Sequence, residues 1–84
     1  MFHYTYIIKN KKDGKIYTGN TKDLRKRLIQ HNTGKSNYTK GRGPFELIYY
    51  EACLIEEKSW SREKYLKSGM GKRYLKNRLG ASYL

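Results

Sequence analysis

An arginine and a histidine lie on the side of a predicted helix that should face the core. Arg27 and His31 are four residues apart. At roughly 100° per residue they share a narrow sector with Leu24 and Leu28. A guanidinium binds phosphate oxygens with a planar fork, and an imidazole transfers protons near neutral pH. The pair therefore indicates a phosphate-handling site.

Two tyrosines precede this helix and have the right position to join the pair. The chain has nine tyrosines, and most tyrosines in a small basic domain are packing residues. Tyr6 and Tyr17 differ, because they lie near the ends of two predicted hairpin strands that come directly before the helix. We expect four polar side chains to converge at one end of the sheet.

Glu63 is the only acidic residue between Ser59 and Lys76. It could form a surface ion pair with a neighbouring cation, namely Arg62, Lys64 or Lys67, which would contribute at most about 1 kcal/mol. It could instead be the sole carboxylate ligand of a divalent cation, with waters and a substrate phosphate completing the shell, as is common for Mg²⁺. A predicted inward-facing position, shared with Ile55, Ser59 and Leu66, favours the metal ligand.

The N-terminal part of the chain predicts a β-hairpin. Residues 2–9 are rich in aromatic and β-branched types, Asp13-Gly14 is a strong turn signal, and residues 16–18 continue in the same style. Gly19 is expected to release the chain from the sheet. Alternation puts Phe2, Tyr4, Tyr6 and Ile8 on one face of the first strand, with Thr5 and Ile7 on the other.

The remaining elements follow from caps, glycines and hydrophobic periodicity. We expect a helix that is capped by Asn20 or Thr21, carries Asp23 in its first turn and ends near residues 32–34, followed by a basic loop over 34–44. A central or half-buried strand is expected over 45–53. Two helices then follow, one from Ile55 to 68–69 and a last one over 71–79. Residues 1–84 then form one α+β domain. It has a small three-stranded antiparallel sheet flanked by helices, in the order ββαβαα.

The charge balance predicts a polyanionic partner. The formal net charge is +12, from 19 Lys and Arg against 7 Asp and Glu, and such an excess opposes a compact monomer unless a polyanion binds. Nucleic acid is favoured over an anionic membrane surface. The residues expected to contact its backbone, without reading sequence, are Lys35, Lys40, Arg42, Lys72, Arg73, Lys76 and Arg78.

Two further features bear on location. Cys53 is the only cysteine, so no internal disulfide can form and a reducing compartment is favoured. No run approaches the ~18 apolar residues that span a bilayer. We expect a soluble cytoplasmic protein that does not bind membranes.

The order and spacing of these residues resemble the GIY-YIG nuclease domains. The resemblance is to the small stand-alone kind related to the nuclease half of the bacterial excision-repair incision subunit. The matching positions are Tyr6, Tyr17-Thr18-Gly19, Arg27 with His31, and Glu63. Tyr4-Thr5-Tyr6 stands where the family name would put Gly-Ile-Tyr, and Thr18 replaces an isoleucine. Asn77 is a weak candidate for the late asparagine of some endonuclease branches.

This resemblance implies hydrolysis of phosphodiester bonds with Mg²⁺ or Mn²⁺. Given this reaction, physical chemistry lets us assign roles as hypotheses: Glu63 holds one divalent cation, Arg27 binds the phosphate oxygens, and Tyr6 activates the attacking water. A free phenol is only ~0.1% ionised at pH 7, and we expect nearby cations to lower the pKa of Tyr6. Tyr17 and His31 would orient the water or Tyr6, with His31 able to shuttle a proton. The choice of base among these three stays open.

Two other functions fit parts of the sequence. A basic, aromatic-rich domain could bind DNA or RNA without cleaving it. A third possibility, ranked last, is a protein-interaction adaptor that uses a strand face carrying Tyr49 and Tyr50. DNA is favoured over RNA as the substrate, in repair or other nucleic-acid processing, and the sequence leaves the oligomeric state open.

Overall fold

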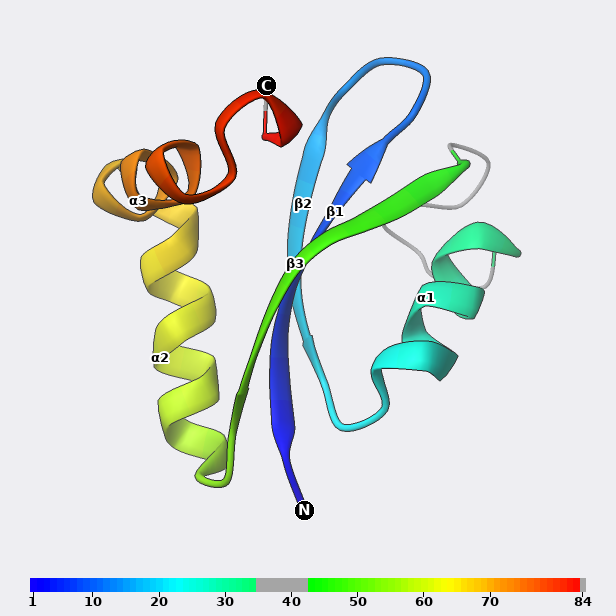
Figure 1. Cartoon of the computed structure of the whole chain (residues 1–84). Helices are drawn as coiled ribbons and strands as arrows, with labels where there is room; N and C mark the ends of the chain where they lie inside the picture. Colours follow the sequence, from blue (N-terminus) through cyan, green and yellow to red (C-terminus); the bar gives the residue numbers. More distant parts are fainter. Residues whose placement is uncertain (35–42, 84) are drawn as a thin grey trace.

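The computed structural model describes residues 1–34 and 43–83. Within these ranges the chain forms a three-stranded sheet with helices on both sides (Figure 1). The elements are β1 (His3–Asn10), β2 (Ile16–Thr21), α1 (Leu24–Asn32), β3 (Phe45–Cys53), α2 (Glu56–Lys67), α3 (Gly69–Leu79) and a short 3₁₀ turn (Gly80–Ser82). The α+β class and the order ββαβαα are confirmed.

The sheet is antiparallel, with the strand order β2-β1-β3. β1 is therefore the central strand, and Tyr6 lies between Gly19 of β2 and Tyr50 of β3. The prediction that residues 45–53 form a half-buried strand is confirmed, but a central position for it is wrong. β3 adds to the free edge of β1 and remains an edge strand itself.

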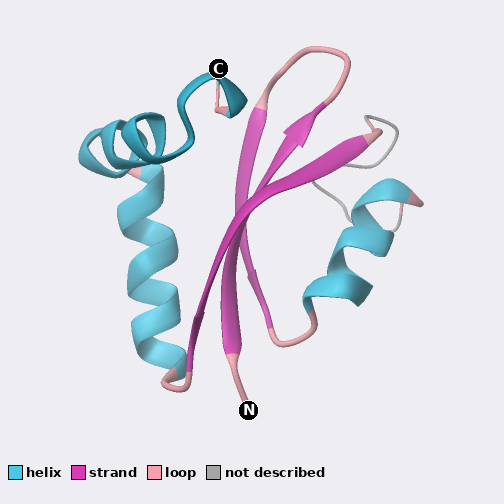
Figure 2. Cartoon of the chain, viewed as in Figure 1, coloured by secondary structure: helices cyan, strands magenta, loops and turns pink. Residues whose placement is uncertain are grey.

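Helices cover both faces of this sheet, with α1 on one face and α2 and α3 on the other (Figure 2). The α1 side holds a core cluster of Tyr6, Ile8 and Phe45, against which Leu24 and Leu28 of α1 pack. The opposite side holds a cluster of Ile7, Leu66 and Leu75. This division follows from strand alternation and confirms the two faces predicted for β1.

The connection from β2 to α1 differs from the prediction. β2 continues through Gly19 to Thr21 and pairs with β1 over its whole length, so Gly19 does not release the chain. The N-cap is Asp23, whose carboxylate accepts a hydrogen bond of 3.0 Å from the Lys26 amide. Asn20 and Thr21 are not caps, because both still belong to the strand.

The C-terminal helices also shift by a few residues. Ile55 is the N-cap of α2 and is 57% exposed, so its predicted inward position is wrong. Ser68 follows α2 and caps α3, because its hydroxyl accepts a hydrogen bond from the Gly71 amide. α3 therefore begins at Gly69, two residues earlier than predicted. None of the described helices has the length and apolar character needed to cross a bilayer.

Candidate active site

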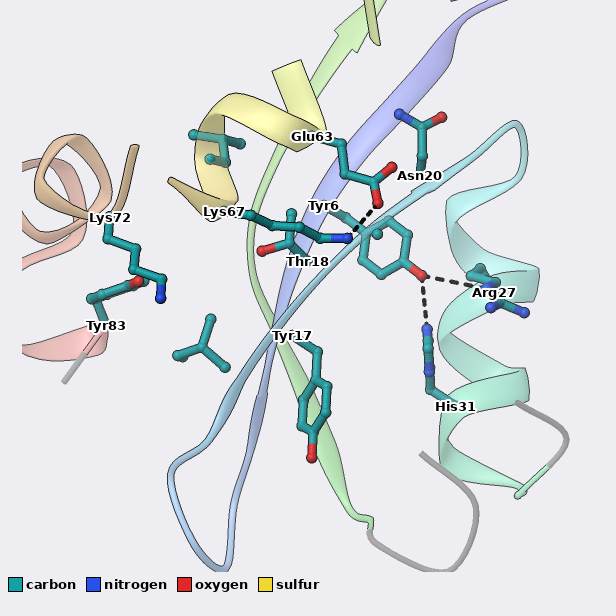
Figure 3. Close-up of a pocket in the computed structure, with 13 residues that line it drawn as sticks. Tyr6, Tyr17, Thr18, Asn20, Arg27, His31, Glu63, Lys67, Lys72 and Tyr83 are labelled. Carbon is teal, nitrogen blue, oxygen red and sulfur yellow. Dashed lines mark hydrogen bonds and ion pairs between the residues drawn. The ribbon is translucent and has the colours of Figure 1, made fainter. Parts of the chain in front are cut away.

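A cleft of about 750 Å³ runs along β2, the edge strand, where side chains from α1 and α2 meet it. All five predicted catalytic side chains line this cleft: Tyr6, Tyr17, Arg27, His31 and Glu63 (Figure 3). They come from β1, β2, α1 and α2, and the first and last of them are 57 positions apart in the sequence. The fold thus brings together side chains that are far apart in the chain.

The phenol of Tyr6 is held by two partners from α1. Its Oη lies 2.7 Å from Nε2 of His31, and Nε of Arg27 donates to the same oxygen over 3.3 Å. Tyr6 and His31 are 3% and 5% exposed. Because Arg27 and His31 are one helical turn apart, both reach the same atom from one helix face, as the sequence spacing predicted.

The protonation states of Tyr6, Arg27 and His31 decide which of them donates in each hydrogen bond. A guanidinium only donates, so Oη of Tyr6 accepts from Arg27, and its single proton can go to Nε2 of His31 when the imidazole carries its proton on Nδ1. Nε2 of His31 is then the acceptor nitrogen of a neutral imidazole. Burial lowers the pKa of His31, and the positive charge of Arg27 lowers it further. Both effects favour the neutral ring that this hydrogen bond requires.

The acidity of Tyr6 differs from the expectation. Burial raises the pKa of the phenol above its ordinary value and outweighs the opposing hydrogen bond and charge of Arg27. The prediction that nearby cations would lower the pKa of Tyr6 is therefore wrong for this site, because the ring is too deeply buried. Tyr6 is a neutral phenol at pH 7, and it can accept a proton only while it gives its own to a neighbour.

Gly19 makes room for the Tyr6 ring. A Cβ atom built at Gly19 would overlap Oη and Cζ of Tyr6, which stands opposite it in the β1–β2 register. Any side chain at this position would force the Tyr6 ring to shift. The glycine of the Tyr-x-Gly motif therefore fixes the position of the Tyr6 hydroxyl, and its place inside a strand follows from this contact.

Glu63 extends from α2 into the same cleft and has a close cationic neighbour. Nζ of Lys67 lies 2.9 Å from Oε2 of Glu63, one turn along the helix, and the side chains are 55% and 24% exposed, respectively. The ion pair considered for Glu63 is therefore formed, with Lys67 as its partner. Glu63 also lines the cleft, and its role as a metal ligand stays a prediction.

The donors available to a divalent cation are few. Among the described residues, no three His, Cys, Asp or Glu side chains group together as a metal cage, and Glu63 is the one carboxylate among those that line the cleft. A hard oxygen donor of this kind fits Mg²⁺ or Mn²⁺ held by one carboxylate, waters and a substrate phosphate. It does not fit a cation enclosed by protein ligands alone.

A buried hydrogen-bond network positions α2 one turn before Glu63. Nδ2 of Asn20 donates to Oγ of Ser59 over 2.7 Å and to Oγ1 of Thr5 over 3.2 Å. Oγ1 of Thr5 also donates to the Ser59 carbonyl over 3.0 Å. These contacts join β1, β2 and α2, so they fix the position of Glu63 relative to β2. Sequence reasoning missed them, although a polar residue directly after Tyr-x-Gly was a usable signal.

Tyr17 has a different environment from Tyr6. Its ring packs edge-on against Phe45, with centroids 5.4 Å apart, and its hydroxyl points away from that of Tyr6 in the close-up (Figure 3). Tyr17 lies opposite Ile8 in the sheet and shares the α1 face. It lines the cleft with its ring and is not part of the trio formed by Tyr6, Arg27 and His31.

The predicted backbone contacts divide into three groups. Lys72 lines the cleft. Arg73, Lys76 and Arg78 are exposed on α3 and do not line it, and the same holds for Asn77. Lys35, Lys40 and Arg42 lie outside the described residues. Lys67 was not predicted to contact nucleic acid, yet its ammonium group is in the cleft.

The adaptor hypothesis required Tyr49 and Tyr50 to share one strand face, and they do not. Tyr49 and Tyr50 are adjacent in β3 and point to opposite sides of the sheet. The hydroxyl of Tyr49 donates to Glu51 over 2.7 Å and lies 3.2 Å from that of Tyr74, and its ring packs in the α2–α3 core. Only Tyr50 is exposed, and it lies on the α1 side.

Comparison with known families agrees with this geometry. Residues 2–78 match the GIY-YIG catalytic domain. The chain belongs to this family, whose members are nucleases, and the positions singled out above fall within the matched range.

The relatives are small proteins of similar length. A UPF0213 protein of Staphylococcus saprophyticus is 43% identical over 75 residues, which cover 88% of this chain and 90% of the relative. One from Clostridium perfringens is 46% identical over 66 residues, covering 77% and 70%. The solution NMR structure of a UPF0213 protein from Bacillus halodurans is 40% identical, with a TM-score of 0.59 over 99% of this chain and 90% of that one.

Proposed function

We propose that this protein is a metal-dependent endonuclease that hydrolyses phosphodiester bonds in DNA, in repair or other nucleic-acid processing in the cytoplasm. One observation carries the proposal. A cleft in a chain of net charge +12 brings together a guanidinium, a neutral imidazole, a phenol bonded to both, and a carboxylate. Membership of the GIY-YIG family supports the same reaction class.

Water activation falls to Tyr6 and His31. The Tyr6 oxygen has two acceptor positions, and the Nε–H of Arg27 takes one of them, which leaves one for a water molecule. As the water oxygen attacks phosphorus, its proton passes to Oη of Tyr6, whose own proton moves to Nε2 of His31 over 2.7 Å. No free phenolate forms, which suits a phenol whose pKa is raised by burial. The phosphorus–oxygen bond to the leaving strand breaks as the new bond forms.

Arg27 and a divalent cation at Glu63 would stabilise the negative charge on the phosphate. Arg27 donates to Tyr6 through Nε and to Oε1 of Gln30 through Nη1 over 3.0 Å. Its guanidinium would also donate to the non-bridging oxygens, and this donation would strengthen as negative charge builds up in the transition state. Glu63 would hold one Mg²⁺ or Mn²⁺. When bound, such an ion supplies Lewis-acid stabilisation of the phosphate and of the departing oxygen.

The remaining residues orient the substrate. Tyr17 forms the wall of the cleft beside Tyr6, so we assign it to positioning rather than to proton transfer. Lys72 would contact the phosphate backbone at the other end of the cleft. Lys35, Lys40, Arg42, Arg73 and Lys76 would add non-specific backbone contacts, so affinity should fall steeply with salt.

A cleavage assay tests the proposal. Purified wild type, Glu63→Gln and Glu57→Gln are incubated with labelled single-stranded, duplex, flap and RNA substrates in EDTA, Mg²⁺ or Mn²⁺. Glu57 is the matched control, because it is an exposed glutamate on the same helix. We expect divalent-dependent cleavage by wild type and Glu57→Gln, and binding without cleavage by Glu63→Gln. Binding without cleavage by the wild type under every condition would make the protein a non-catalytic binding module.

A further inference from the structure

Three aromatic rings form a continuous strip on the α1 face of the sheet. The ring centroids of Phe2 and Tyr4 are 6.5 Å apart, and those of Tyr4 and Tyr50 are 5.9 Å apart, the second pair in an edge-on arrangement. Tyr4 is in the central strand and Tyr50 is in β3, so the strip crosses the sheet. We call Phe2, Tyr4 and Tyr50 the aromatic strip.

The described helices leave this strip open. Phe2 is 49% exposed and Tyr50 is 53% exposed. The end of α1 is tied to the opposite end of β3, because the Asn32 amide group bonds both the N–H and the C=O of Phe45. Single exposed aromatic residues are ordinary, but rings in contact with one another form a patch, and contiguous apolar patches mark binding surfaces.

The aromatic strip continues into the candidate active site. Tyr50 stands directly opposite Tyr6 in the β1–β3 register. Tyr4 precedes Tyr6 by two residues on the same face, a spacing of about 7 Å along a strand. The phenol that bonds Arg27 and His31 is therefore the next ring beyond the strip.

The net charge of the chain and the apolar rings of the aromatic strip indicate which class of ligand would bind there. The chain has a net charge of +12. Tyr6 lines the cleft proposed to hold the phosphate, and it is the neighbour of Tyr4 and Tyr50 in the sheet. A ligand that places phosphates in the cleft and flat apolar faces on the rings is a nucleotide chain. Its bases must be unpaired, because the faces of paired bases are stacked inside a duplex. Aromatic side chains bind bases of any sequence in this way.

We propose that Phe2, Tyr4 and Tyr50 stack on unpaired bases next to the phosphate held in the cleft, which makes single-stranded segments the preferred substrate. This inference rests on the proposed function for its phosphate site. It adds a base-binding surface and a substrate class.

Binding without metal tests the inference separately from cleavage. Fluorescence anisotropy in EDTA compares a labelled single-stranded oligonucleotide, an abasic strand of the same length and charge, and a blunt duplex. The variants are Tyr50→Ala, Phe2→Ala and Tyr50→Trp, with Trp60→Ala as the matched control. Trp60 is an aromatic residue on α2 that is 56% exposed and outside the strip.

We expect the wild type to prefer the base-bearing strand over the abasic one. Tyr50→Ala should weaken binding of the base-bearing strand by roughly 5- to 100-fold and leave the abasic strand unchanged, because one stacked base is worth about that much. Tyr50→Trp should restore the affinity, and Trp60→Ala should match wild type.

Three results would overturn the inference: equal affinity of the wild type for both strands, an equal loss in Trp60→Ala, or sedimentation that shows self-association abolished by Tyr50→Ala. The last would make the strip an interface between copies. Glu63-dependent cleavage without base preference would reject the strip and keep the nuclease. A base preference that depends on Tyr50, in a protein that does not cleave, would keep the strip as a base-binding surface and reject the nuclease.

Discussion

The hydroxyl of Tyr6 lies 2.7 Å from Nε2 of His31, and both side chains are almost completely buried. The two residues are 25 positions apart and come from the central strand and the first helix. Arg27 supplies a second contact to the same oxygen, and burial together with the charge of Arg27 lowers the pKa of His31, which favours a neutral ring that can accept the phenol proton at Nε2. A proton can therefore leave Tyr6 toward His31 as soon as another arrives from water.

Tyr6→Phe removes only the oxygen at the centre of this trio. If Tyr6 relays the proton, single-turnover cleavage should slow by about 10²- to 10⁴-fold, the usual contribution of general acid–base catalysis. Substrate binding in EDTA should change little. Tyr17→Phe is the matched control, since its ring lines the cleft and its hydroxyl points away from that of Tyr6. A Tyr6→Phe enzyme with the wild-type rate would exclude Tyr6 as the group that takes the proton from water.

Much of this trio could be predicted from the sequence. A helical period of 3.6 puts Arg27 and His31 on one face whatever the rest of the chain does, and a strand period of two puts Tyr6 on the face opposite Thr5. Glu63, on a separate helix, was singled out as the only acidic residue in a basic segment and by its inward-facing sector, and the resemblance to the GIY-YIG domains assigned it to the same site. These predictions depended on local geometry and on a motif, and both survive folding.

The errors concern tertiary contacts. Gly19 was predicted to end the strand, because glycine in isolation disfavours a strand, yet the Tyr6 ring requires it there. The pKa of Tyr6 was predicted to fall, because cations are visible in a sequence and the burial that opposes them is not. Asn20 was considered a cap, although its amide bonds Ser59, 39 positions away. Each of these errors concerns a contact between residues that are distant in the chain, which helix and strand periodicity does not reveal.

Stability should depend on pH through His31. The pKa of its folded state lies below the ordinary value of about 6.5, because burial and Arg27 disfavour the charged ring. The unfolded chain then binds a proton that the folded chain excludes, so stability is fully present above about pH 6.5 and falls as the pH drops toward the folded pKa. Urea unfolding midpoints at pH 7.5 and 5.5 measure this loss. His31→Gln should show a smaller loss over the same interval, and an identical loss in both proteins would contradict the linkage.

Gly19→Ala should displace the Tyr6 ring. The added methyl group would overlap Oη and Cζ of a buried side chain, and such overpacking costs about 1–3 kcal/mol. Gly69→Ala is the matched control, because a Cβ there meets no heavy atom within 4 Å. Urea unfolding should show the loss in Gly19→Ala alone, accompanied by slower cleavage. If the space is needed for Tyr6, the cost of Gly19→Ala should shrink in a Tyr6→Ala background, and an undiminished cost there would assign the defect to the backbone.

Lys67→Met should make the protein bind divalent cations more tightly. The ammonium group of Lys67 lies 2.9 Å from Oε2 of Glu63, so an incoming cation must compete with it for the one carboxylate in the described part of the cleft. An ion pair this exposed is worth up to about 1 kcal/mol, which corresponds to an increase in affinity of up to about 5-fold. Calorimetric titration with Mn²⁺ and the Mg²⁺ midpoint of cleavage should shift together. Lys64→Met, an exposed lysine of α2 that does not line the cleft, is the control for lost charge. Equal shifts in the two variants would reduce the effect to net charge, and a weaker cation affinity in Lys67→Met would mean that Lys67 organises the carboxylate instead of competing for it.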